Sequence, residues 1–100
     1  MAIVTLTTDF GYKDYYKAAV RGSLLSMVPD VQVEDISHGI KKYNILEAAF
    51  VIKNAYRFFP KGSVHIIGVM THASSDVDHV ALEYDGHYFI SADNGVFSYL

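Results

Sequence analysis

The sequence has no cysteine and no tryptophan, and only two of its 100 residues are proline. Without cysteine, the chain can form no disulfide, no cysteine-ligated zinc finger and no catalytic thiolate. Disorder and collagen-like repeats are also excluded, because 51% of the residues are hydrophobic and 14% are aromatic. These proportions indicate one globular unit, and the lack of cysteine fits a reducing compartment, so we expect a cytoplasmic protein.

Long apolar runs and an excess of positive charge are absent as well. The apolar runs are too short to span a bilayer, and the first residues lack the basic start and cleavage site of a signal peptide. Eight Lys and Arg residues against eleven Asp and Glu give a formal net charge of −3, the wrong sign for nonspecific binding to nucleic acids. We therefore expect no membrane or polynucleotide partner.

Apolar periodicity alternates between the pattern of buried strands and that of helices. It predicts a strand, a helix, a strand, a helix and a strand, at residues 2–8, 14–28, 31–36, 45–59 and 63–69. This order implies right-handed crossovers and a parallel sheet. Asp85-Gly86 then separates residues 80–84 from 87–90, which is the signal of a type I′ hairpin. We expect an α/β three-layer sandwich of β-α-β-α-β order, with a mainly parallel sheet extended by an antiparallel hairpin.

Two further patterns describe the helices. Asn44, followed three positions later by Glu47, predicts a capped start for the second helix. In the first helix the apolar residues form one stripe, and Lys13, Lys17 and Arg21 fall at four-residue steps on the other side. The first helix is therefore predicted to be amphipathic, with these three charges opposite its apolar face.

The last five residues are mostly apolar and follow a turn at residues 93–95. If they form a strand, its edge and one face have no later residue to cover them, and an uncovered apolar edge promotes association. We expect the natural product to continue beyond Leu100. Residues 1–100 are predicted to be a single α/β domain, the first part of a larger amino-terminal domain.

In open parallel sheets, ligands bind beyond the carboxyl ends of the strands. Asp9 stands at such an end, where a buried carboxylate needs donors, either protein amides or the paired hydroxyls of a sugar. Asp14, at the start of a helix, is either an N-cap or a ligand contact. Tyr43 offers a flat face to a base or a sulfonium, or else packs as a staple on the second helix.

Five histidines are present, but none pairs at the spacing of a zinc-binding helix, and no metal is expected. His38 directly follows a strand and is predicted to be a buried, hydrogen-bonded residue that pins its loop. His65 lies inside a strand and is predicted to be a packing residue.

Four motifs together resemble a known family. They are TTDFG at residues 7–11 with Asp14, VEDISH at 33–38, FFPKGSVH at 58–65 and DNG at 93–95. At these spacings the chain resembles the amino-terminal domain of the S-adenosyl-L-methionine (SAM) hydroxide adenosyltransferases, relatives of the fluorinase and chlorinase. The resemblance covers nearly all 100 residues.

The resemblance implies an α/β domain that is joined, in full-length members, to a carboxyl-terminal β-barrel that these 100 residues do not contain. It implies a homotrimer with SAM bound between neighbouring subunits, as substrate or ligand and without a metal. By matching position, Asp9 would hold the ribose hydroxyls, Asp14 would contact the ligand near its methionine part, and Tyr43 would lie beside the ligand. The implied reaction is attack of water or hydroxide at ribose C5′, which yields adenosine and methionine.

Two positions depart from the family pattern. Met70 stands where hydrolases carry an aspartate that helps to position water, and Val77 falls where they carry an arginine. Met70 is therefore assigned only as a ligand contact, and the catalytic residues stay unassigned. Three interpretations remain open: a SAM hydrolase, a non-catalytic module that binds adenosine or SAM, and a structural fragment.

Overall fold

The computed structural model describes residues 2–13, 15–28, 30–69, 79–92 and 95–99. The strands are β1 (Ala2–Thr8), β2 (Val31–Ser37), β3 (Val64–Gly68), β4 (His79–Tyr84) and β5 (His87–Ala92). The helices are α1 (Tyr16–Met27) and α2 (Ile45–Ala55), with short 3₁₀ turns η1 (Tyr56–Phe58) and η2 (Val96–Tyr99). The predicted order of elements is confirmed up to the end of the hairpin.

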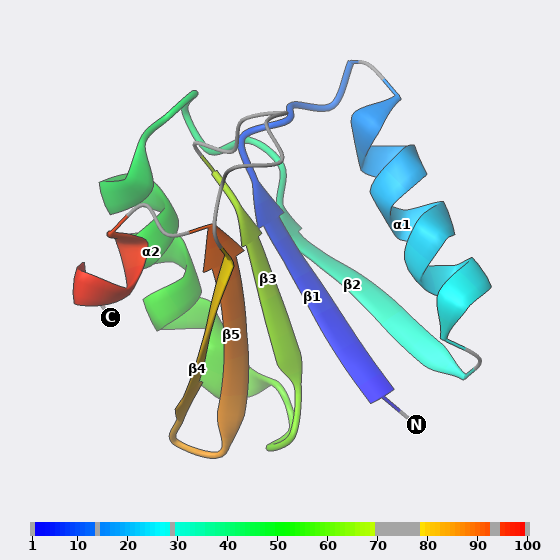
Figure 1. The fold of residues 1–100 in the computed structure, drawn as a ribbon. Helices are drawn as coiled ribbons and strands as arrows, with labels where there is room; N and C mark the ends of the chain where they lie inside the picture. Colours follow the sequence, from blue (N-terminus) through cyan, green and yellow to red (C-terminus); the bar gives the residue numbers. More distant parts are fainter. Residues whose placement is uncertain (1, 14, 29, 70–78, 93–94, 100) are drawn as a thin grey trace.

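The strands form one sheet in the order β2-β1-β3-β5-β4 (Figure 1). Every pair is parallel except β4 with β5, so the predicted antiparallel extension is confirmed. β1 is hydrogen-bonded on both sides, to β2 and to β3, and its residues from Val4 to Thr8 are all buried. This is the environment that its nearly continuous apolar and β-branched sequence predicts.

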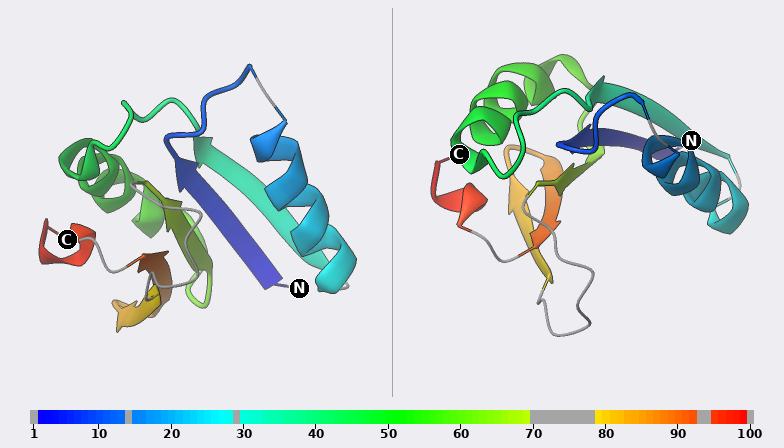
Figure 2. Two further views of the ribbon diagram at one scale, coloured as in Figure 1. Left: turned by 45° about the horizontal axis from the view of Figure 1, so that its top comes forward. Right: turned by 90° about the horizontal axis from the view of Figure 1, so that it is seen from above.

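The two helices lie on opposite faces of the sheet and give three layers (Figure 2). On one face, Val20 and Leu24 of α1 pack against a small core from β1 and β2. On the other face, α2 contributes Ala48, Ala49 and Ile52 to a larger core that includes residues of β3, β5 and η2. The three-layer α/β architecture is confirmed.

The hairpin between β4 and β5 has the predicted two-residue turn. Asp85 and Gly86 have φ of 55° and 79°, the positive values that a type I′ turn requires at both central positions. Tyr84 pairs directly with His87 across the turn. A local dipeptide therefore sets the register of the whole hairpin.

Helix α2 begins as the sequence predicts. The Asn44 side chain accepts a hydrogen bond of 3.0 Å from the Glu47 amide. The Glu47 carboxylate reaches back to the Lys41 amide at 3.2 Å, so it ties the preceding turn to the helix. After Ala55 the chain tightens into η1, which ends close to the predicted boundary at residue 59.

The orientation predicted for α1 is wrong. None of its residues is fully buried, and Leu25 of the predicted apolar stripe is 53% exposed. Lys17 and Arg21 instead turn toward the Asp35 carboxylate on β2, at 3.9 and 3.5 Å. The helix faces the sheet with charged as well as apolar residues because an acidic side chain lies on the sheet beneath it.

The strand that the sequence analysis considered for the end of the chain does not form over Val96–Tyr99. Residues from Val96 to Tyr99 form η2, in which Val96 is 1% exposed and Phe97 packs against the α2 core. The apolar residues of this segment therefore fill a gap beside α2 instead of forming an open sheet edge. No helix in the described part of the chain is long and apolar enough to cross a membrane.

Candidate functional site

The loops after β1 and β2 meet at the carboxyl edge of the sheet. The Gly11 amide donates to the His38 carbonyl at 2.8 Å, and the Ile40 amide donates to the Thr8 carbonyl at 3.3 Å. Gly11 has φ of 79°, which an L side chain rarely adopts, so a glycine here lets the first loop bend toward the second. The two loops form one connected surface at the expected place for a ligand.

Asp9 and Tyr43 are brought together at this edge. The Asp9 Oδ2 atom accepts a hydrogen bond of 2.9 Å from the Tyr43 amide, and the Asp9 amide donates to the Gly68 carbonyl of β3 at 3.3 Å. Asp9 is only 7% exposed, so a protein amide supplies one of the donors that its buried carboxylate needs. The Tyr43 side chain is 59% exposed, so its ring is open to solvent instead of being buried against α2.

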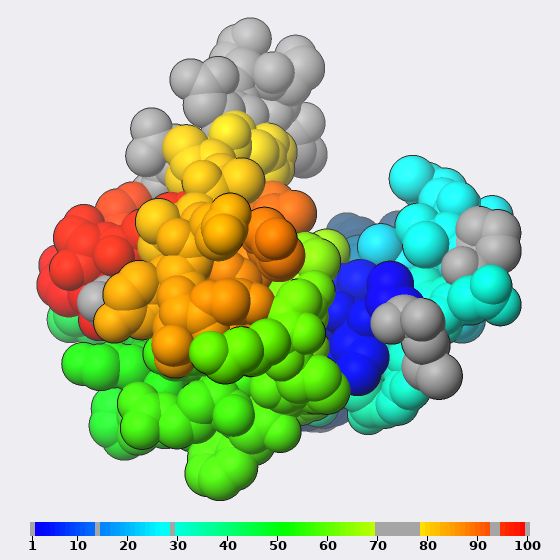
Figure 3. All heavy atoms as spheres, turned by 90° about the horizontal axis from the view of Figure 1, so that it is seen from below, coloured from blue at the N-terminus to red at the C-terminus, as the bar shows by residue number. Residues whose placement is uncertain are grey.

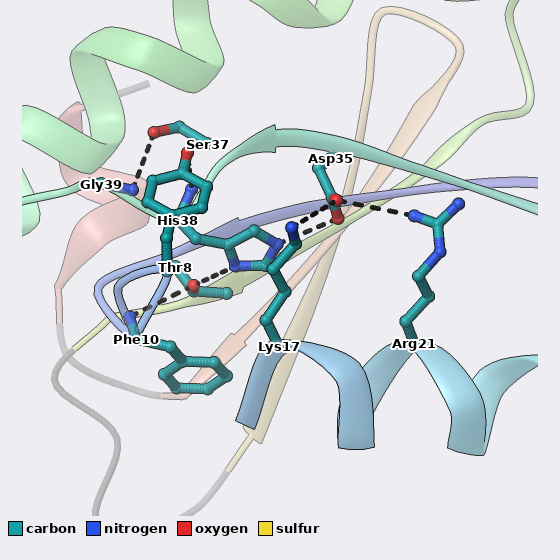
Figure 4. Close-up of polar contacts among 9 residues, drawn as sticks. Thr8, Phe10, Lys17, Arg21, Asp35, Ser37, His38 and Gly39 are labelled. Carbon is teal, nitrogen blue, oxygen red and sulfur yellow. Dashed lines mark hydrogen bonds and ion pairs between the residues drawn. The ribbon is translucent and has the colours of Figure 1, made fainter. Parts of the chain in front are cut away.

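His38 directly follows β2, in the second of these loops. It is completely buried, its Nδ1 lies 2.5 Å from Thr8 Oγ1, and its Nε2 lies 2.9 Å from Asp35 Oδ1 (Figure 4). The predicted role of a buried histidine that pins its loop is confirmed. The sequence analysis did not assign its partners, although the spacing from Asp35 to His38 was visible in the VEDISH motif.

Tyr12 was not predicted either, and it completes the contacts around His38. Its hydroxyl accepts a hydrogen bond of 2.9 Å from the His38 amide, and its ring meets the imidazole edge to face at 5.8 Å. The pKa of the Tyr12 phenol is lowered, first by the hydrogen bond from the His38 backbone and then by a bond to Ser37. The Lys17 ammonium lies 5.4 Å from the Tyr12 ring centroid, a cation–π contact.

A mostly apolar cavity of about 170 Å³ opens on the α1 side of the sheet, beside Thr8. Figure 3 shows the notch between α1 and the β4–β5 hairpin on this side. Gly68 borders the cavity, and a Cβ there would lie 3.2 Å from Thr8 Cγ2 and 3.4 Å from Phe10 Cζ. Glycine at this position lets the Phe10 ring lie close to β3, so the loop that carries Asp9 stays against the sheet.

Comparison with known proteins decides the family. Residues 4–100 match the model of the SAM hydroxide adenosyltransferase N-terminal domain. The chain belongs to this family. The resemblance in the four motifs is thereby confirmed over almost the whole chain.

Relatives of this adenosyltransferase-family domain include a hydrolase and a halogenating enzyme. It is 37% identical to the (R)-S-adenosyl-L-methionine hydrolase of Methanocaldococcus jannaschii, over 98% of this chain and 39% of that protein. It is 36% identical to the fluorinase of Actinopolyspora mzabensis, over 62% of this chain and 21% of that protein. A solved structure of a conserved protein from Thermotoga maritima superposes with a TM-score of 0.82 at 28% identity, over 94% of this chain and 36% of that chain. The domain thus spans at most 39% of the length of these relatives.

Several predicted positions of this SAM hydroxide adenosyltransferase domain lie outside the described residues. They are the proposed ligand contacts Asp14 and Met70, and Val77 at the position of the family arginine. Within the described residues, no three His, Asp or Glu side chains gather into a group that could hold a metal ion. Among the described residues, the candidate site consists of Asp9 and Tyr43, with the hydrogen bonds of His38 holding the same loop.

A second buried histidine belongs to the opposite face of the adenosyltransferase domain. His65 Nδ1 lies 2.6 Å from Thr5 Oγ1, and its Nε2 lies 3.1 Å from Nδ1 of His87. Burial, followed by repulsion from His87, lowers the pKa of His65 to about 4. The ring packs beneath η1, against Tyr56 and Phe89. The predicted packing role of His65 is confirmed. His65 lies away from the carboxyl edge of the sheet, where Asp9 and Tyr43 meet.

Proposed function

We propose that this domain supplies the ribose-binding part of a SAM site, in an enzyme of the family that converts SAM and water to adenosine and methionine. The family membership supports SAM as the ligand, and the name of the relative in Methanocaldococcus jannaschii supports hydrolysis. The resemblance further supports a homotrimer in which a neighbouring subunit closes the site.

The observation that carries the proposal is the pairing of Asp9 with Tyr43. The two residues come from different loops, 34 positions apart, and are joined at 2.9 Å. A carboxylate has about four acceptor positions on its two oxygens, so the same group can bind a protein amide and the hydroxyls of a ribose. The neighbouring Tyr43 ring, exposed to solvent, is placed to contact a base or a sulfonium.

The proposed hydrolysis of SAM needs little acid catalysis from the protein. The C5′–S bond of SAM breaks while a C5′–O bond forms with water, methionine leaves with the electron pair of the broken bond, and the water loses a proton. Because the leaving sulfur is already a sulfonium, it needs no proton. The site must instead hold the ribose so that C5′ faces an in-line nucleophile in a dry environment.

Turnover by this chain is expected to be very slow even where SAM binds. Met70 and Val77 replace an acid and a cation that orient water in the family pattern, and neither side chain can do so. This substitution favours a second candidate, a module that binds adenosine or SAM without hydrolysing it. Chromatography of adenosine released at saturating SAM separates the two, because rapid release indicates a hydrolase and none indicates the binding module.

The test is calorimetry of adenosine and SAM with the chain and with Asp9→Asn. Asparagine can still accept the Tyr43 amide but loses the charge, so we expect affinity to fall by roughly 1.5–3 kcal/mol, the scale of hydrogen bonds to a charged group. Asp85→Asn is the matched control. It alters a carboxylate at the opposite edge of the sheet and keeps a residue that tolerates positive φ. Equal affinities of Asp9→Asn and the parent, or no binding at millimolar ligand, would refute the proposal.

A further inference from the structure

His38 is the centre of a hydrogen-bond relay that runs from helix α1 to the loop carrying Asp9. Arg21 and Lys17 of α1 face the Asp35 carboxylate, Asp35 meets His38 Nε2, and His38 Nδ1 meets the Thr8 hydroxyl (Figure 4). The relay crosses between the ends of two neighbouring parallel strands, since Thr8 ends β1 and His38 follows β2.

The direction of each hydrogen bond in the relay is fixed by its acidic end. An ionised carboxylate can only accept, so Asp35 requires the proton of His38 to be on Nε2. When the ring carries this one proton, Nδ1 is an acceptor and the Thr8 hydroxyl donates to it. The Thr8 oxygen in turn accepts the Phe10 amide at 3.3 Å. The relay therefore ends on the backbone immediately after Asp9.

The main chain of His38 holds the same loop at two more points. Its amide donates to the Tyr12 hydroxyl at 2.9 Å, and its carbonyl accepts the Gly11 amide at 2.8 Å. Phe10, Gly11 and Tyr12 are thus all bonded to His38 or to its partner Thr8. Asp9 lies between Thr8 and Phe10, so these bonds hold the backbone on both sides of it.

We infer that His38, through Thr8 and Asp35, is a positioning residue for the proposed SAM site: it fixes the Asp9 loop against Tyr43. This inference rests on the proposed function for its ligand, and on the hydrogen bonds above for its geometry. Lys17 and Arg21 contribute by neutralising Asp35, whose side chain is 26% exposed. The orientation of α1, which turns Lys17 and Arg21 toward Asp35, therefore helps to hold the proposed site.

The structure offers a matched pair for separating positioning from stability. Thr5 and His65 form the same kind of bond as Thr8 and His38, with both partners of each pair buried. The Thr5–His65 pair lies under η1 and α2, away from Asp9. The Thr8–His38 pair lies at the carboxyl edge of the sheet, next to Asp9. Thr5→Val and Thr8→Val each remove one hydroxyl and leave one buried imidazole nitrogen without its partner, and Thr8→Val also removes the acceptor of the Phe10 amide.

The experiment measures adenosine affinity and amide hydrogen exchange of Tyr43 in both variants. We expect Thr8→Val to weaken adenosine binding and to speed Tyr43 exchange by about fivefold each, the effect of one net hydrogen bond. Thr5→Val should lower the melting temperature and leave both quantities unchanged. The inference is wrong if Thr8→Val behaves like Thr5→Val: the melting temperature falls, while Tyr43 exchange and adenosine affinity stay at the parent values.

A second measurement covers the case in which Thr8→Val does not fold. Nitrogen-15 spectra of the imidazole rings report the tautomer of His38, which we expect to be Nε2–H in the parent and mixed in Asp35→Asn. An Nδ1–H ring in the parent would contradict the relay. Failure of the proposed function is recognised separately, because Asp9→Asn would then leave adenosine affinity unchanged while Thr8→Val still alters Tyr43 exchange.

Discussion

Lowering the pH from 7 toward 4 is expected to destabilise the domain through one buried pair of histidines. His65 is completely buried and His87 is 2% exposed, with 3.1 Å between the facing nitrogens. Burial is the main reason that the pKa of His65 falls to about 4, and the neighbouring His87 adds to the shift. The pKa of His87 is lowered too, again first by burial. Protonation of either ring therefore costs the folded state free energy.

The size and sign of this loss of stability follow from the number of protons bound by the folded and unfolded states. In the unfolded chain an imidazole titrates near 6.5, so between that pH and 4 the unfolded state binds more protons than the folded one. Stability from this group is fully present above pH 6.5 and is lost as the pH falls. At about 1.4 kcal/mol for each pH unit, the loss from His65 reaches about 3 kcal/mol at pH 4.

Urea unfolding at a series of pH values, for the parent and for His65→Asn, measures this loss. Asparagine can still meet the Thr5 hydroxyl but does not titrate, so the free energy of unfolding of the variant should depend less steeply on pH in this window. The carboxylates titrate in both proteins, so the difference between the two curves reports His65 together with its interaction with His87. Parallel curves between pH 6.5 and 4 would refute the reasoning.

Three substitutions and one control test local features by thermal melting. Gly86→Ala should destabilise by about 1 kcal/mol, because φ is 79° and the new Cβ would lie 3.0 Å from Lys61 Cδ. Gly22→Ala, in helix α1 with no atom within 4 Å of the new Cβ, should stabilise by roughly 0.5–1 kcal/mol, and the same sign for both would contradict this account. Asn44→Ala should cost about 1 kcal/mol through loss of the α2 cap. Asn54→Ala, the control, should cost less, because its side chain donates only to the Phe50 carbonyl at an exposed position of the same helix.

Features that depend on neighbouring residues could be predicted from the sequence. The Asp85-Gly86 turn and the Asn44 cap each act through contacts within a few positions, and both are present. The buried character of β1 is carried by its own residues in the same way. The types of secondary-structure elements and their order were predicted from such local patterns.

Features that depend on the register between strands distant in the sequence could not be predicted from the sequence. The bond between Thr8 and His38 exists because β1 and β2 end side by side, and no spacing in the sequence encodes that contact. The inward turn of Lys17 and Arg21 was missed for the same reason, since it depends on Asp35 lying on the face beneath α1. Asp9 and Tyr43 were named individually, but their direct contact emerges only in three dimensions.

The central place of β1 also governs the order in which the domain assembles during synthesis. β1 is made first, yet its two partner strands are completed only at residues 37 and 68, and the Thr5–His65 bond joins positions 60 apart. Such distant pairings must close long loops before they gain stability, which slows folding. Asp9 leaves the ribosome early and must wait for Gly68, whose carbonyl holds its amide. On the nascent chain, Asp9 therefore gains this bond only after Gly68 has been translated, although β1 itself is made much earlier.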